Sequence, residues 1–148
     1  FHNGPHEDYA VVAADSRVHR IPDRVGDEDA TFLELAFTAM NGVRKGTIRL
    51  GERVAVIGLG VVGQLACLWS RLDGGFRVIA ADVSARRLDR ASAMGVETLL
   101  DASGDLPALV KAETGNRGAE VVIEATMAPV SSKQCSFNAS AERMTSRW

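Results

Sequence analysis

The sequence is poor in cysteine, is nearly balanced in charge and contains no long apolar run. Its 148 residues include only two cysteines, Cys67 and Cys135, too few for a disulfide framework or a four-cysteine zinc site. A formal net charge of −2 argues against the basic surface of a nucleic-acid binder. No apolar stretch reaches membrane-spanning length. We therefore expect about one domain with no nucleic-acid or membrane partner, and the missing secretory signal favours the cytoplasm.

The most informative segment is a glycine-rich motif directly behind an apolar run. Residues 53–57, Arg-Val-Ala-Val-Ile, precede residues 58–63, Gly-Leu-Gly-Val-Val-Gly. This order predicts a strand, a tight turn and the start of a helix, the arrangement with which dinucleotide folds bind phosphate. Gly58 permits the turn, Gly60 lets the backbone approach a pyrophosphate, and Gly63 lets the helix pack against the strand.

The start of that helix and the end of the next strand complete the motif. The helix N-terminus, beginning with Val61 and Val62, offers unpaired N–H groups and a partial positive charge to phosphates. A second apolar strand, residues 78–81, ends in Asp82, nineteen residues after Gly63. An acidic residue at about that distance binds the adenosine ribose in dinucleotide folds. The alternative is a glycine-rich turn that binds nothing, which the presence of Asp82 disfavours.

Strand-like and helix-like segments alternate between residues 53 and 124. The predicted strands are 53–57, 77–81, 97–100 and 119–124, and the predicted helices between them are 61–72, 84–94 and 105–114. This alternation predicts an α/β fold with a parallel sheet and right-handed crossovers. Ser84 and Asp105 are the predicted N-caps of the second and third helices. The predicted apolar face of the first helix consists of Val61, Leu65, Leu68, Trp69 and Leu72.

The two ends of the chain are less regular. Residues 9–14 and 18–21 are predicted strands. Residues 27–45 are predicted to form one helix, because acidic residues open the segment and basic residues close it. Residues 131–148 contain no strand-like run, and their pattern allows only a weak helix across 131–143.

These residues resemble the medium-chain dehydrogenases, specifically the zinc-type alcohol, polyol and threonine dehydrogenase branch. The resemblance rests on residues 51–65 around the glycine motif, on Asp82 followed by Arg87-Leu88, and on residues 121–126, Val-Val-Ile-Glu-Ala-Thr. It covers about residues 1–130. What it implies about fold is a Rossmann-type sheet of four parallel strands in the order 3-2-1-4.

The resemblance also implies a division of the chain. Residues 7–12 resemble the end of the family's catalytic domain, and residues 32–44 resemble the helix that joins its two domains. Residues 1–50 would thus be a remnant of the catalytic domain with the linking helix, residues 51–130 an NAD-binding half-domain, and residues 131–148 an unmatched tail. The family's cysteine and His-Glu zinc ligands lie upstream of this segment, so we expect a fragment of a longer parent.

Such a family implies hydride transfer between an alcohol or polyol and NAD. It also implies that the full-length parent contains zinc, which acts as a Lewis acid. The parent is expected to be a homo-oligomer. By this resemblance Glu34 corresponds to a late zinc ligand, and Thr38, one helical turn later, would lie against the nicotinamide. Arg87 would pack near the adenosine, and the backbone of Thr126 would line the nicotinamide ribose. The alternative is a solvent-facing Glu34 and a helix-packing Thr38.

Two other functions stay open: a dinucleotide-binding fragment without catalysis, and a methyltransferase with a similar loop. For this chain alone we expect neither dehydrogenase activity nor stoichiometric zinc, because Glu34 is one carboxylate and a catalytic zinc takes about three protein ligands. We expect Asp82 to favour NAD over NADP. Because the family's later strands are missing, Val121 to Ile123 would lie at an uncovered sheet edge, which predicts marginal stability and association.

Overall fold

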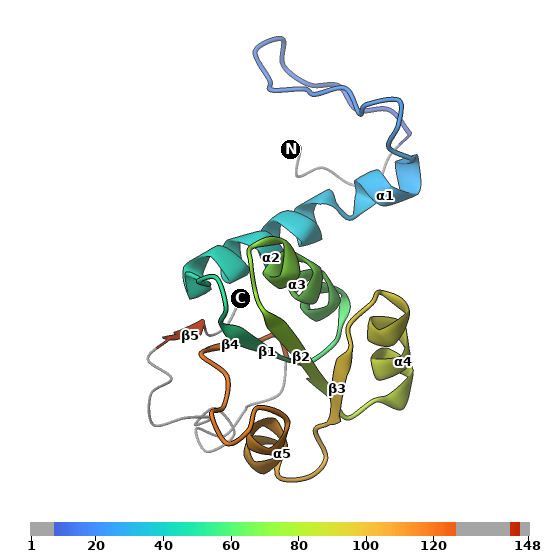
Figure 1. Ribbon diagram of the computed structural model, residues 1–148. Coiled ribbons are helices and arrows are strands. Elements are labelled where there is room, and N and C mark those ends of the chain that lie inside the picture. Colours follow the sequence, from blue (N-terminus) through green and yellow to red (C-terminus); the bar gives the residue numbers. More distant parts are fainter. Residues whose placement is uncertain (1–7, 127–142, 146–148) are drawn as a thin grey trace. The chain divides into compact units, whose positions relative to one another are not determined.

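The computed structural model describes residues 8–126 and 143–145. The chain divides into two compact units, residues 1–32 and residues 33–148. The first unit contains the short helix α1 (Asp27–Thr31), and the described strands all belong to the second unit (Figure 1). The candidate site is therefore built by the second unit.

The second unit is built around one parallel sheet. Its strands are β1 (Arg53–Ile57), β2 (Arg77–Asp82), β3 (Thr98–Asp101), β4 (Val121–Glu124) and β5 (Arg143–Thr145). Their order is β3-β2-β1-β4-β5, and each neighbouring pair is parallel. The predicted α/β fold and strand order 3-2-1-4 are confirmed, with a fifth strand added beside β4.

The connecting helices cover both faces of the sheet. They are α2 (Leu33–Gly46), α3 (Val61–Leu72), α4 (Ala85–Ala93) and α5 (Leu106–Glu113). Val54 and Val56 pack on the face that α2, α3 and α4 cover, whereas Ala55 and Ile57 pack on the face that α5 covers (Figure 1). Successive strand residues thus enter opposite cores, as a sheet buried on both faces requires. Within the described residues, no helix has both the length and the apolarity needed to cross a bilayer.

The buried face of α3 differs from the predicted one. Val61 is 48% exposed and Leu72 is 76% exposed. The fully buried residues of the helix are instead Gly63, Ala66, Cys67 and Ser70. Small side chains let the helix lie close to the sheet, and the larger Leu65 and Trp69 pack against the margin of the core. Helix 61–72 itself has the predicted bounds.

Strand β5 overturns two expectations about the end of the chain. Residues 131–148 were expected to hold no strand, yet β5 pairs with β4 in the register Val121↔Arg143, Val122↔Met144 and Ile123↔Thr145. The edge at Val121 to Ile123 is therefore covered, and the predicted exposure of this strand is wrong. A strand of three residues is too short to show a recognisable alternation. The weak helix considered for 131–143 lies mostly outside the described residues.

Two further expectations near the N-terminus are wrong. Residues 9–14 and 18–21 form no strand, and Tyr9 and Val11 are 91% and 99% exposed. Apolar alternation alone does not make a strand, which also needs a neighbouring strand to pair with. The helix predicted for 27–45 is interrupted at Phe32, whose N–H donates to the Asp29 carbonyl three residues back instead of four.

Candidate functional site

The glycine turn joins the carboxyl end of β1 to the start of α3. Gly58 has a φ of +88°, which only glycine adopts readily, and its N–H donates to the Ala81 carbonyl at 2.8 Å. A Cβ at Gly58 would lie 2.6 Å from the Thr126 methyl carbon, and one at Gly63 would overlap the Gly58 carbonyl oxygen. The two positions thus have no room for a side chain, because the turn is enclosed between β4 and α3.

Gly60 meets a different environment from the other two glycines of the motif. It is the N-cap of α3, with an extended backbone and no side-chain cap, and a Cβ built there meets no atom within 4 Å. The first intrahelical bond is donated by the N–H of Gln64 to the Gly60 carbonyl at 3.0 Å. The preceding N–H groups, of Val61 to Gly63, have no intrahelical acceptor in a helix. An open surface beside such donors suits an anion.

Asp82 ends β2 and connects the glycine turn to the next βα turn. Its side chain is 3% exposed. Oδ2 accepts from the Leu59 N–H at 2.7 Å and from Arg87 Nη1 at 3.3 Å, and Oδ1 accepts from the Ser84 N–H at 2.8 Å. The residue that the sequence singles out for the ribose therefore lies beside the glycine turn and is hydrogen-bonded to it.

The surroundings of Asp82 favour its charged form. Burial on its own raises the pKa of this carboxyl, but the hydrogen bonds from the Leu59 and Ser84 N–H groups and from Arg87 outweigh that effect. The pKa of Asp82 consequently lies below its usual range. Near neutral pH the site presents a fixed negative charge, with a half-exposed Arg87 guanidinium as its nearest cation.

The predicted cap of α4 is only half right. Ser84 occupies the N-cap position, yet its side chain makes no capping hydrogen bond. Its backbone N–H is used by Asp82 instead, which forms the turn between β2 and α4. At α5 the prediction is confirmed, because Asp105 Oδ1 accepts from the Ala108 N–H at 3.2 Å.

A second buried carboxylate, Glu124, escaped the sequence analysis. It ends β4 in register with Ile57, the last residue of β1, and it is 6% exposed. Its Oε1 accepts from the Thr126 N–H at 2.7 Å and from the Thr126 hydroxyl. The available signal was its position: ligands of open α/β sheets gather at the carboxyl ends of the strands.

Glu34 and Thr38 lie on α2, in the first half of the helix. Glu34 is exposed and Thr38 is partly buried. The helix is joined to α3 by a hydrogen bond from Trp69 Nε1 to the Ala36 carbonyl at 2.9 Å. Within residues 8–126 and 143–145, no group of three or more His, Cys, Asp or Glu side chains could hold a metal ion. The roles of Glu34 and Thr38 stay predictions.

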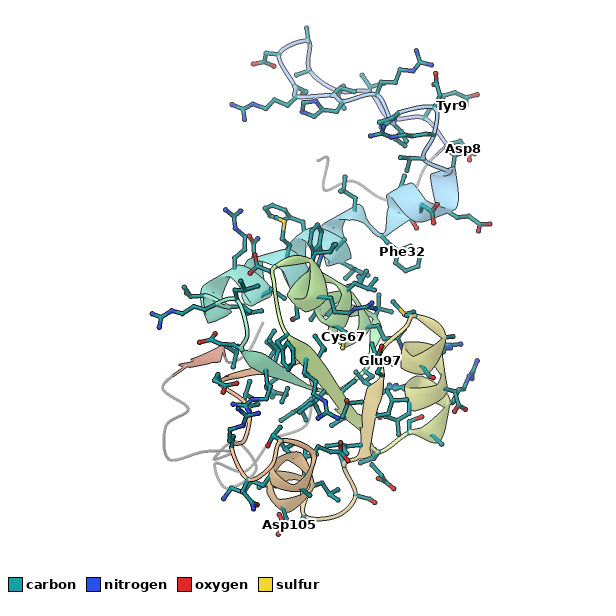
Figure 2. All side chains as sticks on the ribbon, viewed as in Figure 1. Asp8, Tyr9, Phe32, Cys67, Glu97 and Asp105 are labelled. Carbon is teal, nitrogen blue, oxygen red and sulfur yellow. The ribbon has the colours of Figure 1, made fainter. Side chains whose placement is uncertain are left out.

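Cys67 is a packing residue of the core. It lies in the interior of the second unit, where it is 1% exposed and packs in the cluster between the sheet and its helices (Figure 2). Burial raises the pKa of its thiol to about 12. A thiol with so high a pKa forms almost no thiolate at neutral pH and is a poor nucleophile or metal ligand.

Comparison with known proteins bears directly on this site. A family model described as zinc-binding dehydrogenase matches residues 61–141, more than half of the chain. The chain is 33% identical over 124 residues to the D-guloside 3-dehydrogenase of Escherichia coli K12, a match that covers 82% of this chain and 35% of that protein. It is 31% identical over 116 residues to the sorbitol dehydrogenase of Homo sapiens, covering 76% and 32%.

A solved structure agrees with the sequence relatives. The alcohol dehydrogenase TADH from Thermus sp. ATN1 superposes with a TM-score of 0.67 and 32% identity, over 73% of this chain and 32% of that one. The chain spans about a third of the length of the curated relatives that it matches. The shared fold and the extent of the family match assign the chain to a family. This chain belongs to the zinc-binding dehydrogenase family.

Proposed function

We propose that residues 51–130 bind NAD, with the pyrophosphate at the glycine turn and the adenosine ribose at Asp82. The observation that carries the proposal is the buried Asp82 carboxylate, which is bonded to the Leu59 N–H inside the turn. The pyrophosphate would lie against the open Cα of Gly60 and the N–H groups of Val61 and Val62 at the N-terminus of α3. Membership of the dehydrogenase family supports the same cofactor class.

The acceptor capacity of Asp82 supports the ribose as its ligand. A carboxylate has about four lone-pair positions, and the three described bonds use both positions on Oδ2 and one on Oδ1. The remaining capacity on Oδ1 suits a ribose hydroxyl. A 2′-phosphate in that place would bring like charges to ~4 Å, which costs on the order of 4 kcal/mol at an intermediate dielectric. Arg87, near the adenosine, would reduce this cost and the resulting discrimination.

For the whole protein we propose hydride transfer between an alcohol or polyol and NAD. Bound NAD supplies the hydride acceptor. In this proposal Thr38 lies against the nicotinamide, and the backbone of Thr126 lines the nicotinamide ribose. Residues 1–50 are the end of a catalytic domain with its linking helix, and residues 51–130 are the NAD-binding half-domain. The parent is a homo-oligomer.

The metal does not fit the described residues by themselves. Zinc in a catalytic site takes three protein ligands, and the described residues offer no such group. Glu34 would complete a zinc site only with ligands that other parts of the parent provide. This contrast favours a second candidate function, a chain that binds the dinucleotide and catalyses nothing alone.

Fluorescence titration with NADH, NADPH and S-adenosylmethionine tests the proposal. We expect the wild-type chain to prefer NADH, and Asp82→Ser to weaken NADH binding and to narrow or reverse the preference. Asp101→Ser is the matched control, because Asp101 ends the neighbouring β3 and accepts from the Ser103 N–H in the same local pattern, yet is exposed. Tighter binding of S-adenosylmethionine, or equal NADH and NADPH affinities in the wild-type chain, would contradict the proposal.

A further inference from the structure

The Glu124–Thr126 pair lies beside the proposed phosphate site and has no role in the function proposed so far beyond the Thr126 backbone. Glu124 is almost fully buried at the carboxyl end of β4. A buried carboxylate is costly unless hydrogen-bond donors surround it. Here one oxygen, Oε1, accepts from both the backbone N–H and the hydroxyl of Thr126. The hydroxyl bond fixes the rotamer of the threonine side chain, and the N–H bond fixes the backbone beside it.

The fixed threonine lies against the glycine turn. The methyl carbon of Thr126 is so close to Gly58 that a Cβ there would approach it to 2.6 Å. From the other side the Gly58 carbonyl contacts α3 at Gly63. The Ala125 N–H donates to the Ile57 carbonyl at 2.8 Å, which joins the carboxyl end of β4 to the carboxyl end of β1. The turn is therefore confined between the end of β4 and the first turn of α3.

We propose that Glu124 is a positioning residue, which acts through the hydroxyl and methyl of Thr126 to hold the glycine turn in its phosphate-binding conformation. The inference rests on the proposed function for its effect on the cofactor, but not for its effect on the turn. A ligand that binds one conformation only is bound less tightly when that conformation is less populated. Loss of the pair should therefore loosen the turn and weaken dinucleotide binding together.

Single substitutions separate the parts of the pair. Thr126→Val keeps the volume and the methyl contact but removes the hydroxyl donor to Glu124. Glu124→Gln keeps an acceptor oxygen and is the conservative rescue, whereas Glu124→Leu removes the acceptor. Thr114→Val is the matched control, because Thr114 is also buried and its hydroxyl bonds the Val110 carbonyl and the Gly118 N–H beyond α5.

Two quantities are measured for each variant, the exchange rate of the turn amides and the affinity for NADH. Hydrogen exchange without cofactor reports the opening of the turn at the Gly58 and Leu59 amides, which are hydrogen-bonded to Ala81 and Asp82, relative to amides in β1. Fluorescence titration reports the dissociation constant for NADH. We expect Thr126→Val to raise both the exchange rate and the dissociation constant, the latter by roughly tenfold or more for one lost bond to a charged acceptor. Glu124→Leu should follow Thr126→Val, and Glu124→Gln should stay near wild type.

The Thr114→Val control distinguishes a positioning effect on the turn from a general loss of stability. Thr114→Val should lower the free energy of unfolding without changing turn exchange or NADH affinity. Unchanged exchange and affinity in Thr126→Val, or an equal loss of affinity in Thr114→Val, would overturn the inference. A wild-type chain that binds neither NADH nor NADPH would overturn the proposed function, while faster turn exchange in Thr126→Val would still support the role of Glu124.

Discussion

Charged side chains are held differently at the amino ends of the parallel strands (the amino edge) and at their carboxyl ends (the carboxyl edge). At the amino edge, oppositely charged side chains pair: Arg53 bonds Glu120, and Arg77 bonds Glu113, each pair with one added bond to a backbone group. At the carboxyl edge, Asp82 is held largely by backbone N–H groups of the two turns beside it. These pairs lie at the strand ends opposite the glycine turn, so we expect them to contribute to folding alone, although Arg53 Nη1 is buried there without a hydrogen-bond partner among the described residues. The carboxyl-edge carboxylate keeps acceptor capacity for a ligand and fixes the loops that would contact it.

This comparison has a direct experimental form. Changes at the amino edge should alter stability and leave the affinity of the folded chain for NADH unchanged. Changes at the carboxyl edge should alter affinity, with or without a loss of stability.

The largest effect is expected within the glycine motif. Gly63→Ala should lower the free energy of unfolding by about 3 kcal/mol or more, because its Cβ would overlap the Gly58 carbonyl of a closely packed turn. Gly60→Ala should change that free energy by less than ~1 kcal/mol, because its φ of −64° and open surroundings accept alanine while the N-cap position favours glycine. Both should weaken NADH binding. Urea unfolding and fluorescence titration measure the two quantities, and full NADH affinity in Gly60→Ala would contradict the phosphate site.

The next effect belongs to the amino edge. Glu120→Ala removes the carboxylate that bonds the Arg53 backbone N–H and guanidinium, whose side chain is 9% exposed. Leaving that cation buried and unpaired should cost about 3 kcal/mol of unfolding free energy. Glu113→Ala is the control, because the Arg77–Glu113 pair is 40% and 43% exposed and should contribute at most about 1 kcal/mol. A changed NADH affinity in folded Glu120→Ala would erase the difference between the edges.

A smaller effect should appear in acid. The pKa of Asp82 is lower in the folded chain than its unfolded value of about 3.9. The stability it contributes is therefore present above that value and is lost as the pH falls through the folded pKa. Unfolding of wild type and Asp82→Asn between about pH 5 and about pH 3 should show a steeper loss for wild type. Hydrogen bonds from Ser103 also lower the pKa of Asp101, but Asp101 is present in both chains and does not contribute to the difference between them. If the free energy of unfolding fell equally with pH in the two chains, the charge of Asp82 would not stabilise the fold.

The smallest effect is expected at Ser84. Because Asp82 uses its backbone N–H and not its hydroxyl, Ser84→Ala should change the free energy of unfolding by less than about 0.5 kcal/mol. Asp105→Ala, which removes the true side-chain cap of α5, should cost about 1 kcal/mol. Chemical denaturation of the two variants compares them. An equal loss in both would show that the Ser84 hydroxyl contributes after all.

Much of the second unit could be predicted because its signals are local. An apolar run followed by the glycine motif located β1 and α3, and the end of the next run located Asp82. Glu124 was missed because its burial depends on register with Ile57 and on Thr126, neither of which a linear pattern shows. Strand β5 was missed for the same reason, since only pairing with β4 defines it. The buried face of α3 was misjudged because the sheet selects small residues where hydrophobicity suggested large ones.

The use of backbone donors at the carboxyl edge has a consequence for mutational tolerance. Leu59 and Ser84 each bond Asp82 through a group that nineteen of the twenty amino acids possess. A deep mutational scan should therefore accept varied side chains at both positions, subject to packing at Leu59, and reject proline at each. Asp82, Gly58 and Gly63 would tolerate almost nothing. A site built in this way leaves only a sparse trace in a sequence: a few glycines and one acid, separated by positions that are free to vary.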